Sequence, residues 1–237
     1  MKFLFYLLSL VPKSLFEYLI DIYLSLGVYK YSSGFKVTSK NIEIAFPDRN
    51  KKDVALLAKR SFKESIISGY ESIYTWGRND AKVNSNILRI ENNYLINNLK
   101  ENGLIAVSFH NRSVDMLLTW MNSQHTTTSL FKKIKNNTLN TYIKQRRESK
   151  NSKCYETNIS GVKEIFKSLK NKNIVCFAAD QVPKRGFGEY IDFFNVKAYT
   201  TTLVQSLVNK TEANVMYFFI QSLSLIHISE PTRRSTI

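Results

Sequence analysis

The segment from His110 to Asp115 (HNRSVD) constrains the fold of this chain more than any other stretch. An apolar run at 104–109 precedes it, and apolar residues with helical spacing follow it from Val114 to Met121. This order predicts a buried strand, a sharp turn that carries a histidine, and then a helix. A histidine at the carboxyl end of a buried strand lies where open α/β sheets bind their ligands. The sequence therefore predicts an α/β fold with a candidate site at His110.

Asp115 is expected in the first turn of that helix. Two residues five positions apart on a straight helix point about 140° away from each other. Asp115 can therefore contact His110 only if the histidine lies in the preceding turn and reaches back. The carboxylate would then hold one imidazole nitrogen and leave the other free as a base. The alternative is a histidine with a purely structural hydrogen bond, and the H-x4-D pattern alone does not separate the two.

The charge balance of the chain indicates an anionic partner. The 237 residues carry a net charge of +15, and 43% of them are hydrophobic, which is enough for a real core. Nucleic acid, an anionic membrane surface and an acidic carrier or substrate all fit this excess of positive charge. Cys154 and Cys176 have neither metal-binding nor redox spacing, so a reducing compartment is the simplest inference.

Residues 1–30 are predominantly apolar, but Pro12 and Lys13 interrupt them. No uninterrupted run reaches the ~18 apolar residues of a typical membrane span, and no small-x-small cleavage site follows the basic start. We expect an uncleaved membrane anchor that lies in the interface or spans at a tilt. The alternative is a pair of buried amphipathic helices.

A long amphipathic helix is predicted over 51–77, because apolar residues recur there at near-helical spacing. Glu71 lies in its last third and is either a solvated charge or a functional residue. A polar loop is expected at 78–86, a short strand at 87–91 and a short helix at 93–100.

A weak internal repeat connects two parts of the chain. Leu99 and Leu169 each end a helical pattern, and each is followed by a polar turn and an apolar strand. His110 and Asp180 follow these two strands at the same distance from the leucines. If the strands are parallel neighbours, His110 and Asp180 should lie at the same edge of the sheet.

Basic residues gather at 132–153, and a helix is predicted at 137–147 within this stretch. The stretch is either a solvated face or a patch that binds phosphate or carboxylate, for which arginine is better suited than lysine. Ser160 is the expected N-cap of a helix at 161–170.

The last part of the chain predicts a strand at 190–194, a left-handed turn at Asn195 and a final strand at 214–221. Threonines at 200–202 are expected to cap a helix at 202–210. Residues 222–237 do not continue the pattern and resemble translated read-through of a sequencing-library adapter, so they are excluded from the fold.

Several blocks occur together in an order that resembles the late acyltransferases of lipid A biosynthesis, the lauroyl/myristoyl-transferase type, which are similar to lysophospholipid acyltransferases. The matching blocks are Asn41-x4-Phe46-Pro47, Glu71-x4-Trp76, His110-x4-Asp115, Asn137…Arg147, Asp180-Gln181, Phe193-Phe194-Asn195-x2-Ala198-x-Thr200-Thr201-Thr202 and Thr211-x-Ala213. The chain departs from the family at Asn195, where the family usually has glycine.

The resemblance implies a mixed, largely parallel sheet flanked by helices, with a hydrophobic membrane-anchor helix at 1–30. It implies an acyltransferase domain at 31–221 and a non-native tail at 222–237. Because the family continues well past this point, we expect the domain to be truncated at its C-terminal end.

The resemblance also implies a function. The enzyme would transfer a fatty acyl group from acyl carrier protein to a hydroxyl of a lipid A precursor, on the cytoplasmic face of a Gram-negative inner membrane. His110 would be the general base and Asp115 would orient it. Arg147, with Arg146 as the alternative, would hold an anionic group of the acceptor or the developing oxyanion. Asp180 would line the site.

The remaining substrate-binding candidates come from the other matching blocks: Glu71, Gln181, Phe193, Phe194 and Thr201. No cofactor or metal is expected, because the donor is a thioester and the sequence has no Gly-rich phosphate loop and no metal cluster. The expected partners are acyl carrier protein, the lipid acceptor and an anionic membrane surface.

Three other functions stay open at this point. The acceptor could be another lipid, such as a lysophospholipid or a glycolipid. The chain could also be a non-catalytic membrane scaffold. A nucleic-acid-binding protein is suggested by the net charge alone; the sequence has no zinc-finger spacing, RNP-like aromatic motif or arginine-rich tail, so no nucleic-acid partner is expected.

Overall fold

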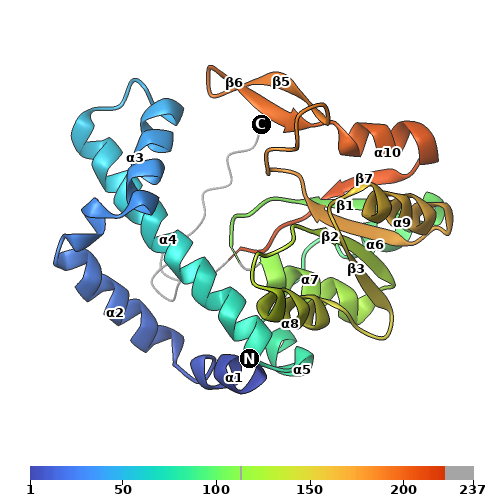
Figure 1. Ribbon diagram of the computed structural model, residues 1–237, viewed down its shortest axis with the longest axis horizontal. Helices are drawn as coiled ribbons and strands as arrows, with labels where there is room; N and C mark the ends of the chain where they lie inside the picture. The colour runs from blue at the N-terminus through green and yellow to red at the C-terminus, as the bar shows by residue number, and fades with distance from the viewer. Residues whose placement is uncertain (113, 222–237) are drawn as a thin grey trace.

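The computed structural model describes residues 1–112 and 114–221 of the chain (Figure 1). Helices of the N-terminal part lie on one side, and a sheet with its flanking helices lies on the other. The long helix α4 runs between the two parts (Figure 1). The tail predicted at 222–237 lies outside the described residues.

The N-terminal part packs its helices around a small apolar core of Ile20, Leu24, Tyr29 and Ile67. Its elements are α1 (Lys2–Leu8), α2 (Lys13–Ser25), the 3-10 helix η1 (Val28–Tyr31), α3 (Ser33–Ala45) and α4 (Lys51–Gly77). The bounds of α4 confirm the helix predicted at 51–77. Its first turn is capped by Asn50, whose side-chain oxygen accepts a hydrogen bond from the Asp53 N–H at 2.9 Å.

Helix α1 packs into the body of the protein through one aromatic side chain. The buried ring of Phe5 stacks on Tyr142, with 5.1 Å between centroids, and meets the edge of Trp76 at 5.6 Å. A Cβ at Gly77 would overlap the carbonyl oxygen of Phe5, so a glycine at the end of α4 allows this close approach.

No single helix among the described residues is long and apolar enough to cross a membrane. Helices α1 and α2 reach that length and composition only together, and the chain bends by 78° between them. The membrane anchor at 1–30 therefore stays a prediction.

The central sheet has five parallel strands in the order β3-β2-β4-β1-β7. They are β1 (Leu104–Ser108), β2 (Thr127–Phe131), β3 (Ser152–Glu156), β4 (Ile174–Ala178) and β7 (Asn214–Tyr217). The other helices are α5 (Asp80–Asn84), α6 (Tyr94–Leu99), η2 (Lys100–Asn102), α7 (Val114–Gln124), α8 (Asn137–Arg147), α9 (Ile159–Lys170) and α10 (Leu203–Thr211). The fold is α/β, as predicted, and the expected mixture of strand directions is limited to a separate hairpin.

Both faces of the sheet are covered by helices, which explains the unbroken apolar runs in β1 and β4. Ile105 and Val107 of β1 face a core shared with α9 and α10. Leu104 and Ala106 point to the opposite face, where they meet α6 and α7.

The hairpin of β5 (Gly188–Phe193) and β6 (Val196–Thr201) stands apart from the central sheet (Figure 1). Its two-residue loop has positive φ angles at Phe194 (48°) and Asn195 (60°), the geometry of a type I′ turn. This confirms the left-handed turn expected at Asn195.

Several local predictions differ from the structure. The cap of α9 is Asn158, whose side-chain oxygen accepts from the Gly161 N–H at 2.9 Å, and not Ser160. Residues 87–91 form no strand. Thr202 makes no side-chain cap bond, whereas Thr201 Oγ1 accepts from the Leu203 N–H at 3.2 Å. The last strand, β7, ends at Tyr217 instead of 221.

Candidate functional site

His110 and Asp180 meet at the carboxyl edge of the sheet, beyond two neighbouring strands. The register pairs Ser108 of β1 with Ala178 of β4, so His110 and Asp180 lie at matching positions two residues later. One carboxylate oxygen of Asp180 lies 2.8 Å from His110 Nδ1, and the other accepts the His110 backbone N–H at 2.6 Å. The placement predicted from the repeat is confirmed.

The ring of His110 is accessible from outside. Its side chain is 48% exposed, and that of Asp180 is 37% exposed. Because the carboxylate accepts a hydrogen bond from Nδ1–H, the lone pair of the neutral ring lies on Nε2. The side-chain amide nitrogen of Gln181 lies 3.4 Å from Nε2. A substrate hydroxyl at Nε2 would therefore meet both the base and the Gln181 amide.

Asp115 does not hold His110, contrary to the expectation. Its carboxylate accepts a hydrogen bond from Arg147 Nε at 2.7 Å and is 7% exposed. The physical reason is that α7 begins at Val114 and turns Asp115 to its buried side, toward α8. The residue that contacts the imidazole is Asp180, 70 positions away from His110.

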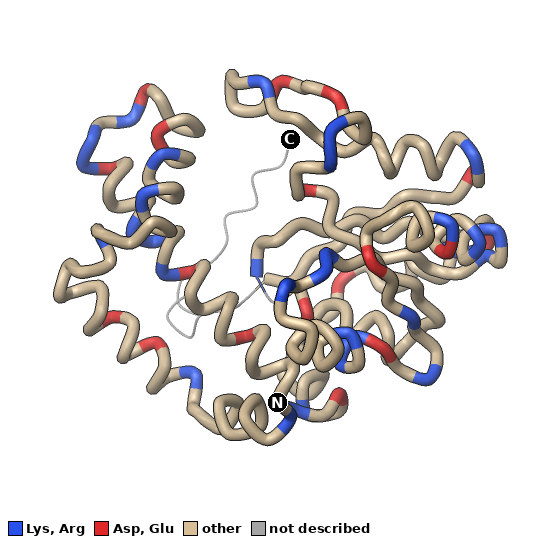
Figure 2. The backbone as a smooth tube through the Cα atoms, in the orientation of Figure 1, with Lys and Arg blue, Asp and Glu red and all other residues tan. Residues whose placement is uncertain are grey.

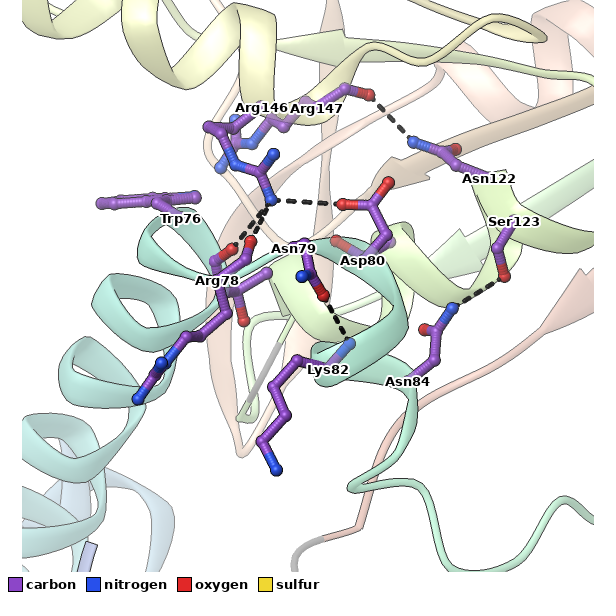
Figure 3. A network of polar contacts seen from close by, with 12 residues as sticks. Trp76, Arg78, Asn79, Asp80, Lys82, Asn84, Asn122, Ser123, Arg146 and Arg147 are labelled. Carbon is purple, nitrogen blue, oxygen red and sulfur yellow. Dashed lines mark hydrogen bonds and ion pairs between the residues drawn. The ribbon is translucent and has the colours of Figure 1, made fainter. Parts of the chain in front are cut away.

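Arg147 forms the other half of this buried ion pair. Burial opposes the charge on its guanidinium, but the nearby Asp115 carboxylate outweighs burial and raises the pKa of Arg147 above its usual value. Its backbone carbonyl accepts a hydrogen bond from Asn122 Nδ2 at 2.9 Å (Figure 3). In this structure the positive charge of Arg147 is thus already matched by Asp115.

Arg146, the alternative to Arg147, points toward the end of α4. Its Nη2 donates to the Thr75 and Arg78 carbonyls and lies 3.1 Å from the Asp80 carboxylate (Figure 3). These contacts join α8 to the last turn of α4 and to the chain that follows it. Neither Arg146 nor Arg147 contacts His110 in the described part of the chain.

Arg112 is a residue of the site region that the sequence reasoning missed. Its Nη2 donates to Glu71 Oε1 at 2.8 Å, and its Nη1 donates to Glu64. Glu71 also accepts from Lys13 Nζ at 3.2 Å and is 7% exposed, so it is not a solvated charge. An arginine two residues after the candidate base, together with an acid on the long helix, was the available signal.

A cavity of about 840 Å³ lies beside the His110 turn, between α4, α7 and the chain after β7. Its lining is mixed, with apolar side chains such as Met116, Leu117, Trp120, Met121, Met216 and Phe218 beside the charged Lys13, Glu71, Arg78, Arg89 and Glu91. The neighbours of His110 adjoin it: Asn111 Nδ2 donates to the Ile220 carbonyl at 2.9 Å, and the Phe109 and Phe219 rings are 5.8 Å apart. The apolar side chains of this cavity offer a surface to a hydrocarbon chain, and its charged side chains offer partners to a polar group.

The other predicted residues lie on or next to the hairpin. Phe193 and Phe194 are exposed, and the Phe194 ring lies 6.3 Å from Phe46 in the segment after α3. Thr201 bonds the start of α10. The structure does not bring these three residues into contact with His110.

Charged residues are spread over the molecule. Figure 2 shows Lys and Arg both in the N-terminal helices and around the sheet, without a single continuous stripe. Within residues 1–112 and 114–221, no group of three or more His, Cys, Asp and Glu side chains is placed to hold a metal ion.

Comparison with known proteins identifies the family. Residues 2–222 match the family described as bacterial lipid A biosynthesis acyltransferase. No curated protein matches the chain. The match spans nearly the whole described chain, including the His110–Asp180 site and the adjoining cavity. The chain therefore belongs to the bacterial lipid A biosynthesis acyltransferase family.

Proposed function

We propose that this acyltransferase moves a fatty acyl group from a thioester to a hydroxyl of a lipid A precursor, with His110 as the general base. The observation that carries the proposal is the half-exposed imidazole whose Nδ1 is held by Asp180 and whose Nε2 lies 3.4 Å from the Gln181 side-chain amide nitrogen. General-base catalysis of this kind typically contributes about 10²–10⁴-fold in rate.

The chemistry needs only groups that the protein and its two substrates supply. Nε2 takes the proton of the acceptor hydroxyl while its oxygen attacks the thioester carbonyl. The tetrahedral intermediate then collapses, the carbon–sulfur bond breaks, and the thiolate leaves with the proton from the imidazolium. Asp180 stabilises the imidazolium that forms between these two steps.

Acyl carrier protein is the proposed donor. The net charge of +15 favours an acidic carrier and a phosphorylated glycolipid alike. The apolar side chains of the cavity next to the His110 turn offer a place for the acyl chain, which would bring the thioester carbonyl toward Nε2.

We further propose that the enzyme works at an anionic membrane surface, the cytoplasmic face of a bacterial inner membrane. Large apolar side chains are exposed on α1 and α2, among them Phe3, Leu4, Leu7, Leu15, Leu19 and Ile22. Two helices with an apolar outer face are suited to lie in the membrane interface.

The test is mass spectrometry of the lipid product. Membranes that carry the chain are mixed with acyl-carrier-protein thioesters and a tetra-acylated lipid A precursor. A mass gain of one acyl group is expected. A parallel reaction with lysophospholipid in place of the precursor tests the alternative acceptor. Acyl transfer to the lysophospholipid and none to the precursor would contradict the proposed acceptor while leaving the reaction class intact.

A further inference from the structure

The turn that carries His110 follows β1, which ends at Ser108, and hydrogen bonds connect this turn to three other parts of the protein. Asp180 holds the backbone and ring of His110 from the β4 side. Asn111 donates to the Ile220 carbonyl on the β7 side. Arg112 donates hydrogen bonds to Glu64 and Glu71 of α4.

The contact with α4 is a forked ion pair. Glu64 and Glu71 are seven positions apart, which places them on one face of α4, two turns from each other. The planar guanidinium of Arg112 donates one N–H to each carboxylate. Arg112 is 18% exposed and Glu71 is 7% exposed, so little water competes for the bond between these two, whereas Glu64 is 50% exposed and its bond is open to water.

Carboxylates already surround the positive charges of this cluster. Arg112 and Lys13 supply two positive charges, and Glu64, Glu71 and Glu17, which lies 4.0 Å from Lys13 Nζ, supply three negative ones. An arginine that binds an anionic substrate group needs N–H groups available for it, whereas both terminal nitrogens of Arg112 already donate to protein carboxylates. This arrangement favours a role in holding the turn over a role in binding substrate.

Helix α4 also supplies one wall of the cavity beside the His110 turn, through Tyr70, Glu71 and Tyr74. Arg112 therefore connects the turn that presents the imidazole to the wall along which the acyl chain would lie. A fixed distance between base and cavity is what a reaction between a bound hydroxyl and a bound thioester requires, because small misplacements are costly in rate.

We infer that Arg112, anchored by Glu71, is a positioning residue that sets the direction of His110 Nε2 relative to the acyl cavity. The inference rests on the proposed role of His110 as the base. It assigns to Glu71 the task of anchoring Arg112, in place of the substrate contact expected from the sequence.

Steady-state kinetics of the membrane-bound chain test the inference. Arg112→Gln should lower kcat about 100-fold and leave KM within twofold, because the base is misdirected while both substrates still bind. Arg112→Lys should recover only part of kcat. Lysine restores the positive charge, but its ammonium lacks the planar geometry with which arginine donates to two carboxylates at once. The matched control is Lys40→Gln, which removes an exposed lysine–glutamate pair of α3 away from the cavity and should change nothing. Wild-type kcat in folded Arg112→Gln, or a higher KM with kcat unchanged, would overturn the inference.

A double-mutant cycle tests the anchor. If Arg112 acts through Glu71, Arg112→Gln/Glu71→Gln should lose no more activity than either single variant. Independent roles would make the losses multiply, to about 10⁴-fold if each single variant loses about 100-fold. Multiplying losses would overturn the assignment of Glu71.

A spectroscopic readout makes the test independent of turnover. The chain has three histidines, so ring ¹⁵N–¹H correlation spectra give few signals, and His110→Ala assigns those of His110. Arg112→Gln, or Arg112→Lys if the first variant does not fold, should shift or split the His110 signals and leave those of His125 in place. Unchanged His110 signals would overturn the inference. Acyl transfer that survives His110→Ala would instead overturn the proposed base, and the spectra would still report on the turn.

Discussion

Two ion-paired carboxylates lie near the carboxyl edge of the sheet, and they differ in environment more than in geometry. Asp180 lies 2.8 Å from His110 Nδ1, and Asp115 lies 2.7 Å from Arg147 Nε. The His110 and Asp180 side chains are 48% and 37% exposed, whereas those of Arg147 and Asp115 are 25% and 7% exposed.

Solvent access distinguishes the His110–Asp180 pair, which is available for chemistry, from the Asp115–Arg147 pair, which supports the fold. An exposed pair adds little stability, because water and salt screen it, and a substrate can reach the half-exposed ring of His110. A buried pair is different, because removing one partner leaves an uncompensated charge in the interior. H-x4-D spacing points to Asp115, but exposure and contact point to Asp180.

Asp180→Asn should give the largest effect on activity. An asparagine amide would donate to Nδ1, which moves the ring proton to Nε2 and removes the base. We expect acyl transfer to fall about 10²–10⁴-fold with little change in the unfolding midpoint. Product mass spectrometry and thermal unfolding in detergent measure the two quantities. If the unfolding midpoint of Asp180→Asn falls far enough to explain the lost activity by unfolding alone, Asp180 supports the fold as Asp115 does, and the contrast between the two carboxylates fails.

Asp115→Asn should show the opposite pattern, with loss of stability as its first effect. Breaking one side of a buried pair destabilises a protein by about 3–5 kcal/mol. Arg147→Gln should have a similar effect, since it breaks the same pair. Denaturant unfolding measures the change. Full stability combined with lost acyl transfer would assign the Asp115–Arg147 pair to catalysis and remove the distinction between the two carboxylates.

A triple substitution of Leu15, Leu19 and Ile22 to serine on the exposed face of α2 should weaken membrane binding. Each exposed leucine or isoleucine that enters the interface contributes on the order of 1–2 kcal/mol, so partition into anionic vesicles should fall more than tenfold. Sedimentation with vesicles measures the partition. Ile159→Ser, at an exposed apolar residue of α9, is the control. Equal partition of the triple variant and the control would refute the membrane role of α2.

The smallest effect concerns Cys176 of β4. Burial raises the pKa of its thiol to about 12 from an ordinary value near 9. Between these values the unfolded chain releases the proton and the folded chain keeps it, so this contribution to stability is complete below pH 9 and is lost as pH rises toward 12. The decline should be about 1.4 kcal/mol per pH unit in that window. Denaturant unfolding at pH 8 and pH 10 should show a steeper loss for the wild type than for Cys176→Ala, and equal slopes would contradict it.

Part of this architecture was predictable because local patterns carry it. The repeat that ends in Leu99 and Leu169 predicts that β1 and β4 are neighbours, and the register places His110 beside Asp180 as expected. The helices α4 and α8 have the predicted bounds because their apolar spacing is regular.

Other parts depend on contacts that local patterns do not reveal. Strand β2 was missed because its buried residues include polar ones, which bond to distant side chains: Thr128 Oγ1 lies 2.8 Å from Ser168 Oγ. The true partner of Asp115 lies 32 positions away on α8. Arg112 was missed for the same reason, since its carboxylates lie on α4.

The most direct test of the central claim compares two histidine variants of the membrane-bound chain. His110→Ala removes the proposed base, and His125→Ala removes a histidine just after α7 as a matched control. The account predicts that transfer from acyl carrier protein to the lipid A precursor falls at least 10²-fold in His110→Ala and stays near the wild-type rate in His125→Ala. Acyl transfer by folded His110→Ala at more than a few percent of the wild-type rate would contradict the account.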